Sequence, residues 1–381
     1  MKTNIFCIIF IFVFFVGCKE EFTLDLQNYN PVIVINGHMT DDIGPYEVNI
    51  SLSSAVNQYK YIPYSGCSVF IMDDQGNEEM LYEVESGVYR TSELGMQGIP
   101  GNCYSLYIET PEGNKYKSDF QKLSKAVEID SVYAKLNYEL VEYYPFELPG
   151  YQFYVNTPKS ENENDYLLWR MEETYEYTAN YHLYAIYNGQ LNFDIREYDD
   201  YYRCWMTQNV NYFYTATTEK LTEPRINKQP LHFVGTDSKR LQVKYSLLLK
   251  QYSINKNAYN YWKNIEKQYS EENFLVANQP YNIKGNIENV DDPNEIVFGY
   301  FTVGAVRQKR IFVDSPDVPF YYMFCSINED YKEAYAMLAK RGNPHPFYIV
   351  RVGEVEGAVA EGCIDCRKEN STINKPDFWT D

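Results

Sequence analysis

Residues 166–178 read YLLWRMEETYEYT, and apolar side chains recur there at every second position. One face carries Leu167, Trp169, Met171, Tyr175 and Tyr177. The opposite face carries Arg170, Glu172, Thr174 and Glu176. Successive side chains of a β-strand point to opposite faces of the sheet, so a period of two is the signature of a strand. This stretch therefore predicts a long strand with one buried face and one face open to water.

Segments of the same kind lie on both sides of it. Towards the C-terminus they are Asn209–Thr217, Leu241–Leu249, Ile296–Val306 and Phe347–Val352. Towards the N-terminus, short alternating runs are separated by turn-forming residues such as Asp73–Asn77. We expect an antiparallel β-sandwich over residues 31–125, Ig-like or transthyretin-like. Residues 126–381 are expected to form a larger β-rich, Tyr-rich domain with a Cys-containing C-terminal tail.

Two helices are predicted within the second domain. The first follows Asn255, a residue suited to capping, and its apolar residues recur at helical spacing as far as Tyr269. The second follows Asn328 and ends at Gly342, and its apolar stripe consists of Tyr331, Tyr335 and Leu338. The predicted fold class is therefore mainly β with a few short helices.

Composition and charge exclude several classes of protein. The chain has 381 residues, 34 of them basic and 53 acidic, which gives a formal net charge of −19. Nucleic acid is not an expected partner, because proteins hold a phosphate backbone with clustered Lys and Arg. An apolar share of 45% is enough for real hydrophobic cores. A single long apolar run argues against a protein that crosses a membrane several times.

That run, Ile5–Val16, follows Lys2 and precedes Gly17 and Cys18. It is shorter than the roughly 20 residues that a membrane-spanning helix needs, but it suits the apolar region of a signal peptide. The small residue before Cys18 resembles a bacterial lipobox, so we expect residues 1–17 to be a lipoprotein signal peptide and Cys18 to be lipidated. An ordinary secretory signal with an incidental cysteine is the alternative.

Residues 18–30 lack periodicity and are expected to be a tether. The tether opens with Lys19, Glu20 and Glu21, a charged flank of the kind that marks lipoproteins exported to the cell surface. A solvated start of a linker is the plainer explanation for the same residues. Several buried acyl chains would hold a soluble body in the membrane, at about 0.8 kcal/mol for each CH₂ group.

Eight short motifs along the chain together resemble a known family. They are Val34-Ile35-Asn36-Gly37-x-x-Thr40-Asp41, Gly87-Val88-Tyr89, Gly101-x-x-Tyr104-x-Leu106, Ala258-Tyr259-x-Tyr261-Trp262, Gly285-Asn286-Ile287, Gly299-Tyr300-Phe301, Cys363-x-x-Cys366-Arg367 and Lys375-Pro376-x-Phe378-Trp379. With these motifs the chain resembles the Bacteroidetes lipoprotein family DUF4249, a domain of unknown function, over essentially the whole mature chain. The resemblance implies an outer-membrane lipoprotein that is frequently associated with a TonB-dependent transporter. It implies no reaction and no ligand.

Six cysteines remain after the predicted signal peptide and Cys18 are set aside, and an even number in an exported protein indicates disulfides. Cys67 and Cys103 lie in the first module and are a natural pair. The other four are expected to form two bridges that tie the C-terminal tail to the second domain, with the pairing left open: Cys204, Cys325, Cys363 and Cys366. Cys363-x-x-Cys366 is alternatively a zinc half-site or a redox dithiol, but no second pair of zinc ligands at comparable spacing accompanies it.

No catalytic motif accompanies these features. The sequence contains no Gly-x-Ser-x-Gly, His-Glu-x-x-His or P-loop pattern, and no metal or cofactor is expected. Tyrosine is abundant, with 39 residues, and tyrosines suit recognition surfaces because they combine contact area with a polar tip. A ligand or partner surface is predicted at Tyr181, Tyr184, Tyr187, Tyr201 and Tyr202. The alternative is that these tyrosines occupy half-wet faces of sheets.

Together these expectations predict a non-enzymatic lipoprotein of the outer membrane, facing the cell exterior. It would act as an accessory or capture subunit of a TonB-dependent transport system. The alternatives are a stand-alone adhesin or envelope structural lipoprotein and, less favoured, a hydrolase whose site has no recognised motif.

Overall fold

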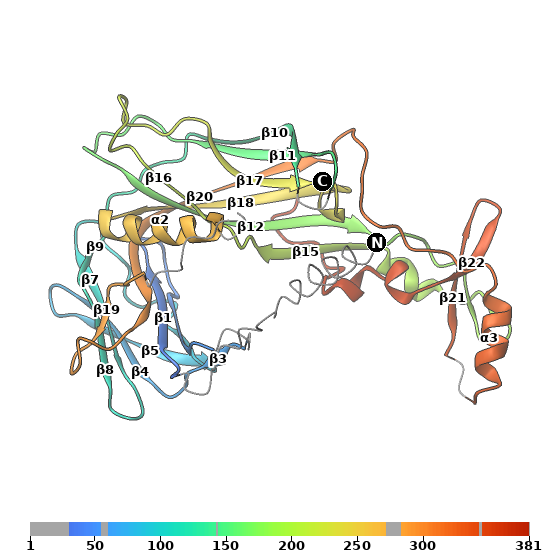
Figure 1. Cartoon of the computed structure of the whole chain (residues 1–381), viewed down its shortest axis with the longest axis horizontal. Helices are drawn as coiled ribbons and strands as arrows, with labels where there is room; N and C mark the ends of the chain where they lie inside the picture. The colour runs from blue at the N-terminus through green and yellow to red at the C-terminus, as the bar shows by residue number, and fades with distance from the viewer. Residues whose placement is uncertain (1–29, 55–59, 142–143, 272–282, 343–344, 381) are drawn as a thin grey trace, which may run out of the picture.

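A computed structural model describes residues 30–54, 60–141, 144–271, 283–342 and 345–380. The predicted signal peptide and the tether up to residue 29 lie outside these residues, and so do Cys18, Lys19, Glu20 and Glu21. The prediction of a mainly β chain is confirmed (Figure 1). Neither of the α-helices in the described part combines the length and the apolar character needed to cross a bilayer.

The largest sheet joins fifteen strands. Its path runs through β15 (Arg203–Asn209), β12 (Tyr166–Thr178), β18 (Lys244–Ile254), β20 (Phe298–Asp314), β1 (Ile33–Met39), β2 (Glu47–Leu52), β6 (Val88–Arg90), β5 (Glu78–Glu85), β4 (Ser68–Asp73), β7 (Cys103–Glu109), β8 (Lys115–Ser118) and β19 (Ile287–Asn289). Three more strands pair beside this path: β16 (Tyr214–Thr217) with β12, β3 (Ile62–Pro63) with β2, and β9 (Gln121–Lys122) with β7.

Strand β20 lies inside this path and joins its two halves, with β18 on one side and β1 on the other. Its first half pairs parallel with β1, from Phe298 opposite Val34 to Val303 opposite Met39. Its second half pairs antiparallel with β18, from Gly304 to Asp314. The N-terminal strands and the long strands of the second half of the chain are therefore hydrogen-bonded into one sheet through a single late strand. We call the parallel pairing of β1 with β20 the seam.

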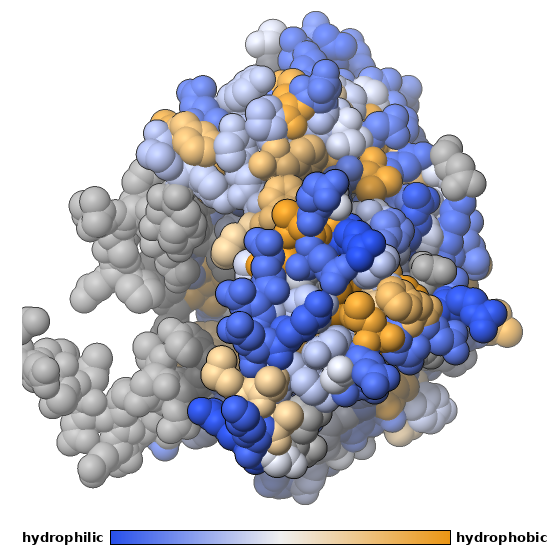
Figure 2. Space-filling view, turned by 90° about the vertical axis from the view of Figure 1, so that its right-hand side faces the viewer, coloured by the Kyte–Doolittle hydropathy of each residue, from blue (hydrophilic) through white to orange (hydrophobic). Residues whose placement is uncertain are grey.

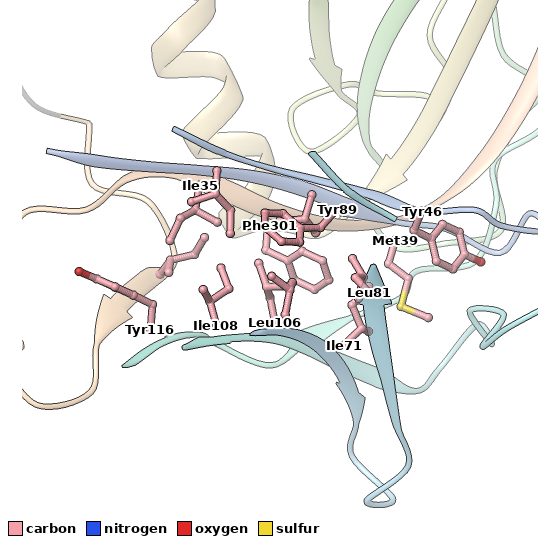
Figure 3. Packing of buried hydrophobic residues seen from close by; sticks show 14 of the residues in the cluster. Ile35, Met39, Tyr46, Ile71, Leu81, Tyr89, Leu106, Ile108, Tyr116 and Phe301 are labelled. Carbon is pink, nitrogen blue, oxygen red and sulfur yellow. The ribbon is translucent and has the colours of Figure 1, made fainter. Parts of the chain in front are cut away.

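Two layers of strands enclose the first hydrophobic core (Figure 3). Ile35 and Phe301 point into it from the layer of β1 and β20, towards Leu106 and Ile108 from β7. Residues from 287 to 305 supply part of this core, including Ile287, Val297, Phe301, Val303 and Ala305. The first module is thus completed by a segment from far along the chain. The domain boundary at residue 125 and the Ig-like or transthyretin-like assignment stay predictions.

A three-stranded sheet covers the other half of the long strands. It consists of β10 (Ser131–Leu140), β11 (Glu147–Asn156) and β17 (Gln229–Gly235). Its inner residue Phe153 packs against Tyr245 of β18 at 5.5 Å between ring centroids, and both side chains are fully buried. Trp169 of β12 is buried in the same core, where its Nε1 donates to Gln251 Oε1 at 2.9 Å.

The predicted strand over residues 166–178 is confirmed as β12, but its polar face is less open to water than expected. Arg170 is exposed, whereas Thr174 and Glu176 are buried. The C-terminal tail covers this end of the strand: Trp379 donates from Nε1 to Glu176 Oε2 at 3.3 Å and packs edge-on against Phe312. A pattern within one strand cannot show that a distant segment lies over it.

The predicted strand Asn209–Thr217 is wrong as a single element. β15 ends at Asn209 and β16 begins at Tyr214, and both pair antiparallel with β12. Between them Val210 N donates to Met171 O at 2.9 Å, so the chain stays beside β12 while the regular pairing is broken. The other three predicted strands in this half correspond to β18, β20 and β21 (Phe347–Val352).

Both predicted helices are present, as α2 (Lys256–Glu271) and α3 (Tyr331–Ala339). Asn255 caps α2, because its Oδ1 accepts from Ala258 N at 2.9 Å. Tyr331 of α3 is buried as expected, but Leu338 is 40% exposed, so the predicted apolar stripe is incomplete. Short 3₁₀ turns lie at η2 (Arg196–Tyr201), η3 (Lys239–Leu241), η4 (Glu361–Cys363) and η5 (Cys366–Glu369).

Helix α3 lies beside a four-stranded sheet at the far end of the molecule (Figure 1). The sheet consists of β14 (Leu191–Asn192), β13 (Ala185–Tyr187), β21 and β22 (Val355–Val359). Figure 2 faces this end and shows separate apolar patches among hydrophilic residues.

Two disulfides hold the C-terminal tail against the second half of the chain, as predicted. They join Cys204 with Cys366 and Cys325 with Cys363. The two cysteines of the Cys-x-x-Cys motif therefore bond to different partners, which leaves no paired dithiol at that motif. The pairing is set by the fold, since 162 residues separate Cys204 from Cys366.

The predicted pair of Cys67 and Cys103 is wrong, because both are free thiols. Strands β4 and β7 pair antiparallel with Ser68 opposite Glu109 and Asp73 opposite Tyr104. The two cysteines therefore lie at opposite ends of this strand pair, about 20 Å apart at the rise of a strand. A disulfide needs Cα atoms within about 7 Å of each other.

Candidate functional site

A cavity of about 440 Å³ lies where helix α2 faces the sheet beside the seam. We call it the helix pocket. It is lined by Asn36, Gly37, His38, Glu47, Asn49, Leu168, Arg170, Phe213, Tyr252, Tyr261, Trp262, Ile265, Tyr300 and Thr302. Such a volume lies in the range of ligand sites, which are about 300–1,000 Å³ and usually combine aromatic walls with a few polar groups.

Strand alternation and register bring these residues together. Leu168 and Arg170 share the outward face of β12, and Tyr252 of β18 lies opposite Leu168. Across the seam, Asn36 of β1 lies opposite Tyr300 of β20, and the next outward pair on the same face is His38 with Thr302. Helix α2 supplies the facing wall with Tyr261, Trp262 and Ile265, which its helical period places on one side.

Arg170 places a positive charge in the helix pocket. Its guanidinium carbon lies 4.8 Å from the centroid of the Trp262 ring. Among the described residues it has no ion pair and no hydrogen bond to an acidic side chain. Desolvation by the surrounding protein lowers the pKa of Arg170 from its ordinary value, while the side chain stays exposed to the pocket. A guanidinium that has lost part of its hydration gains from an anionic partner.

The acidic residue of the helix pocket is already engaged. Glu47 forms an ion pair with Arg90 at 2.8 Å and accepts from Asn49 Nδ2 at 2.8 Å. These contacts neutralise its charge locally, so among the described residues that line the helix pocket Arg170 carries the charge that is open to a ligand.

His38 contributes a neutral ring. Desolvation by the surrounding protein lowers the pKa of His38 to about 4, with Arg170 and Lys250 acting in the same direction and Glu47 opposing them. The imidazole nevertheless remains exposed to the pocket. At neutral pH it can therefore donate one hydrogen bond and accept another, but it does not add a second positive charge.

The aromatic walls are held by contacts outside the cavity itself. Trp262 donates from Nε1 to Thr302 Oγ1 at 3.0 Å, which fixes the indole against the sheet. Tyr261 lies between Trp262 and Tyr300, with ring centroids 5.2 Å and 4.5 Å away. A wall that is ordered before the ligand arrives loses little side-chain entropy on binding.

A second cavity of about 350 Å³ adjoins the helix pocket across Tyr261 and Tyr300, which line both. We call it the amide cavity, because its lining includes the side chains of Gln121, Asn257, Asn260, Asn264 and Asn286. Asp119 and Lys284 also line it, one charge of each sign, and amide groups both donate and accept hydrogen bonds, so this cavity suits a polar group without net charge.

The five tyrosines predicted as a ligand or partner surface lie elsewhere, and none lines the helix pocket: Tyr181, Tyr184, Tyr187, Tyr201 and Tyr202. All are half-buried. Guanidinium groups cover two of them, with Arg351 4.0 Å from the ring of Tyr184 and Arg367 3.3 Å from that of Tyr201. Tyr202 stacks on His182 at 3.6 Å. These contacts within the chain fit the half-wet alternative, and the role as a partner surface stays a prediction.

The helix pocket does not follow from the sequence alone, although two of its parts are visible there. Arg170 stood on the polar face of the strand at 166–178, and Tyr261 with Trp262 stood in the predicted helix. What was missing was the parallel pairing of β1 with β20, which brings Asn36 and His38 to the same place.

The structure thus defines a mainly β protein with a ligand-sized pocket built across its central sheet. The chain belongs to the family described as Domain of unknown function (DUF4249), which matches residues 19–310. Three of the motifs that carry the resemblance lie at the seam or in the helix pocket, at residues 34–41, 258–262 and 299–301, whereas the Cys363-x-x-Cys366 and Phe378-Trp379 motifs lie beyond the matched residues.

Comparison with curated proteins gives no match. A solved structure titled "Biofilm associated protein - BSP domain" is 8% identical, with coverage of 74% of this chain and a TM-score of 0.13. The chain spans 59% of that structure's length. A similarity at this TM-score carries no argument about fold or function.

Proposed function

We propose that this chain is a non-enzymatic lipoprotein of the outer membrane that faces the cell exterior. In this proposal it captures a small ligand in the helix pocket and delivers it to a TonB-dependent transporter as an accessory subunit. The apolar run before Cys18 and the acidic flank after it support the lipid anchor and the export. The resemblance to lipoproteins that accompany such transporters supports the partner.

The observation that carries the capture role is Arg170. It is a partly desolvated cation that stacks on Trp262 and lacks an acidic partner among the described residues. A charge without a partner costs the folded chain stability. The presence of this charge in a ligand-sized cavity therefore supports the proposal that Arg170 serves to bind a ligand.

The chemistry of the lining supports binding rather than catalysis. Hydrolysis through a covalent intermediate commonly uses a serine or cysteine beside a base, and the described residues that line the helix pocket include neither. Thr302 uses its hydroxyl to accept from Trp262, and Glu47 is held by Arg90 and Asn49. These two groups are engaged in contacts within the chain, so neither is an activated nucleophile among the described residues of the lining.

The strand layers of the first module act in this proposal as a spacer between the anchor and the helix pocket. We propose that they form the Ig-like or transthyretin-like sandwich predicted over residues 31–125, completed by β19 and β20. A tether of residues 18–30 would then end next to β1, whose outward residues Asn36 and His38 line the pocket.

Two measurements test the proposal. Cys18→Ala should move the chain from the outer-membrane fraction to the soluble fraction, whereas Cys7→Ala, within the predicted signal peptide, should leave it with the membrane. Detergent extraction of the wild-type chain should then bring a TonB-dependent transporter with it. A Cys18→Ala chain that still sediments with outer membrane would contradict the anchor, and repeated purification of the wild-type chain alone would contradict the partner.

Deletion of the gene separates capture from adhesion. Loss of uptake of one nutrient is the expected result for a capture subunit. Loss of attachment with unchanged uptake would instead support the adhesin alternative.

A further inference from the structure

We infer that the helix pocket takes a carboxylated sugar, with the carboxylate on Arg170 and the sugar ring against the aromatic wall. This inference names the ligand class for the capture role and therefore rests on the proposed function.

The charge of the site fits a single carboxylate. Arg170 is the open cation of the helix pocket, His38 is neutral at physiological pH, and Glu47 lies in the same lining. A planar guanidinium forms paired hydrogen bonds with a carboxylate. A phosphate group would carry up to two negative charges and is usually held by several cations, whereas Arg170 is the one Lys or Arg among the described residues of this lining.

The walls of the site fit a hydroxylated ring rather than a purely apolar one. Tyr261, Trp262 and Tyr300 form a continuous aromatic surface, against which the C–H face of a sugar can pack. Around this surface the side chain of Asn36 and the hydroxyl of Tyr252 have no hydrogen-bond partner among the described residues. A flat apolar acid would leave such groups unpaired, whereas sugar hydroxyls can pair with them.

The amide cavity extends the same argument. It adjoins the helix pocket at Tyr261 and Tyr300, and α2 contributes Asn257, Asn260 and Asn264 to it. These amides are uncharged, and the lining also holds one acidic and one basic residue, Asp119 and Lys284, so the cavity suits a second sugar unit without net charge. The two cavities together therefore favour a short oligosaccharide that carries its carboxylate at the unit on Arg170.

The test measures binding of D-glucuronate and D-glucose to the full-length chain in detergent, by NMR titration of the Trp262 indole N–H. That signal is assigned by its loss in Trp262→Phe. The two sugars differ in a carboxylate against a CH₂OH group, so their ratio of affinities reports the charge contact. We expect glucuronate to bind at least about tenfold more tightly than glucose, the effect of one hydrogen-bonded charge.

Arg170→Gln should remove this preference while glucose binding stays within about twofold, because glutamine keeps a polar side chain without the charge. Arg196→Ala is the matched control, since Arg196 is highly exposed and distant in the fold, on η2. It should leave the preference intact. The unfolding temperature of each variant shows whether it is folded.

Equal binding of the two sugars by the wild-type chain, or no binding of either, overturns the inference. A preference that survives in Arg170→Gln also overturns it. None of these results touches the anchor or the transporter, which are tested by fractionation and co-purification, so failure of the ligand class and failure of the proposed function are distinguishable.

Discussion

The seam between β1 and β20 depends on glycines at two positions, and this makes its contribution to stability measurable. Gly299 has φ +98°, and a Cβ built on it would lie 1.9 Å from Ile35 O. Gly285 has no such φ, but its Cβ would lie 1.9 Å from Gly299 O. Gly113 has φ +89° with open space around it. Gly299→Ala therefore tests close approach and backbone strain together. Gly285→Ala tests close approach alone, and Gly113→Ala tests strain alone.

The expected magnitudes follow from these geometries. A positive φ costs an L-residue about 1–2 kcal/mol, so Gly113→Ala should lower the free energy of unfolding by that amount. Gly299→Ala adds the displacement of β1 at Ile35, with loss of about two ladder hydrogen bonds worth roughly 1 kcal/mol each. We expect Gly299→Ala to cost about 3–4 kcal/mol. Gly285→Ala, with the clash but no strain, should cost about 2 kcal/mol.

The assay is urea unfolding of each purified variant, followed by tryptophan fluorescence and far-UV circular dichroism. Gly299→Ala should lower the free energy of unfolding most, followed by Gly285→Ala and then Gly113→Ala. At the least, the loss for Gly299→Ala should clearly exceed the other two. If Gly299→Ala and Gly113→Ala shift the free energy of unfolding equally, within about 0.5 kcal/mol, the seam is not a close backbone contact and the reasoning is refuted.

Three further predictions concern the second half of the chain. The double variant Cys204→Ala with Cys366→Ala should lower the free energy of unfolding by up to about 5 kcal/mol in the same urea assay, because this bridge closes a long loop. Cys103→Ala breaks no bridge and should lower it by less than about 1 kcal/mol. Burial lowers the pKa of His232 to about 4, with Arg240 acting in the same direction and Glu173 opposing it. The unfolded chain therefore binds a proton at this residue below pH 6.5, whereas the folded chain binds it only near pH 4. Stability should therefore fall by up to about 3 kcal/mol as pH falls from 6.5 to 4, and His232→Phe should flatten the unfolding midpoint over that window. Trp379→Ala should lower the free energy of unfolding by about 3–5 kcal/mol, measured by thermal unfolding, because the side chain is only 5% exposed. Trp379→Phe should lower it by less, because phenylalanine keeps most of the packing. Equal losses of stability in both variants would mean that the hydrogen bond to Glu176 contributes more than the packing.

Local patterns in the sequence were enough for elements whose cause is local. The strand at 166–178 follows from alternation of side chains, and the start of α2 follows from the capping amide of Asn255. The class, mainly β, and the bridging of four cysteines to the tail also followed from composition and position.

Contacts between distant segments were not accessible in this way. The seam joins β1 to residues more than 260 positions away, and no feature of either strand specifies the other as its neighbour. The same limit explains the free thiols of Cys67 and Cys103: membership of one module does not set which ends of two strands meet. The helix pocket was missed for the same reason, because its lining comes from five strands, a helix and the connection between β15 and β16.

Stability and ligand binding should be coupled through the seam. Asn36 and His38 stand on β1, and Tyr300 and Thr302 stand opposite them on β20, so the two walls of the helix pocket on this side are set by one strand pairing. This pairing requires that no side chain be present at Gly299, the residue immediately before Tyr300. The side chain of Asn286 fixes Phe301, the residue after Tyr300, because it donates to Phe301 O at 3.0 Å and accepts from Phe301 N at 2.9 Å. A change in register at this point moves the ligand site and the first hydrophobic core together, because Phe301 faces the core while Tyr300 faces the pocket.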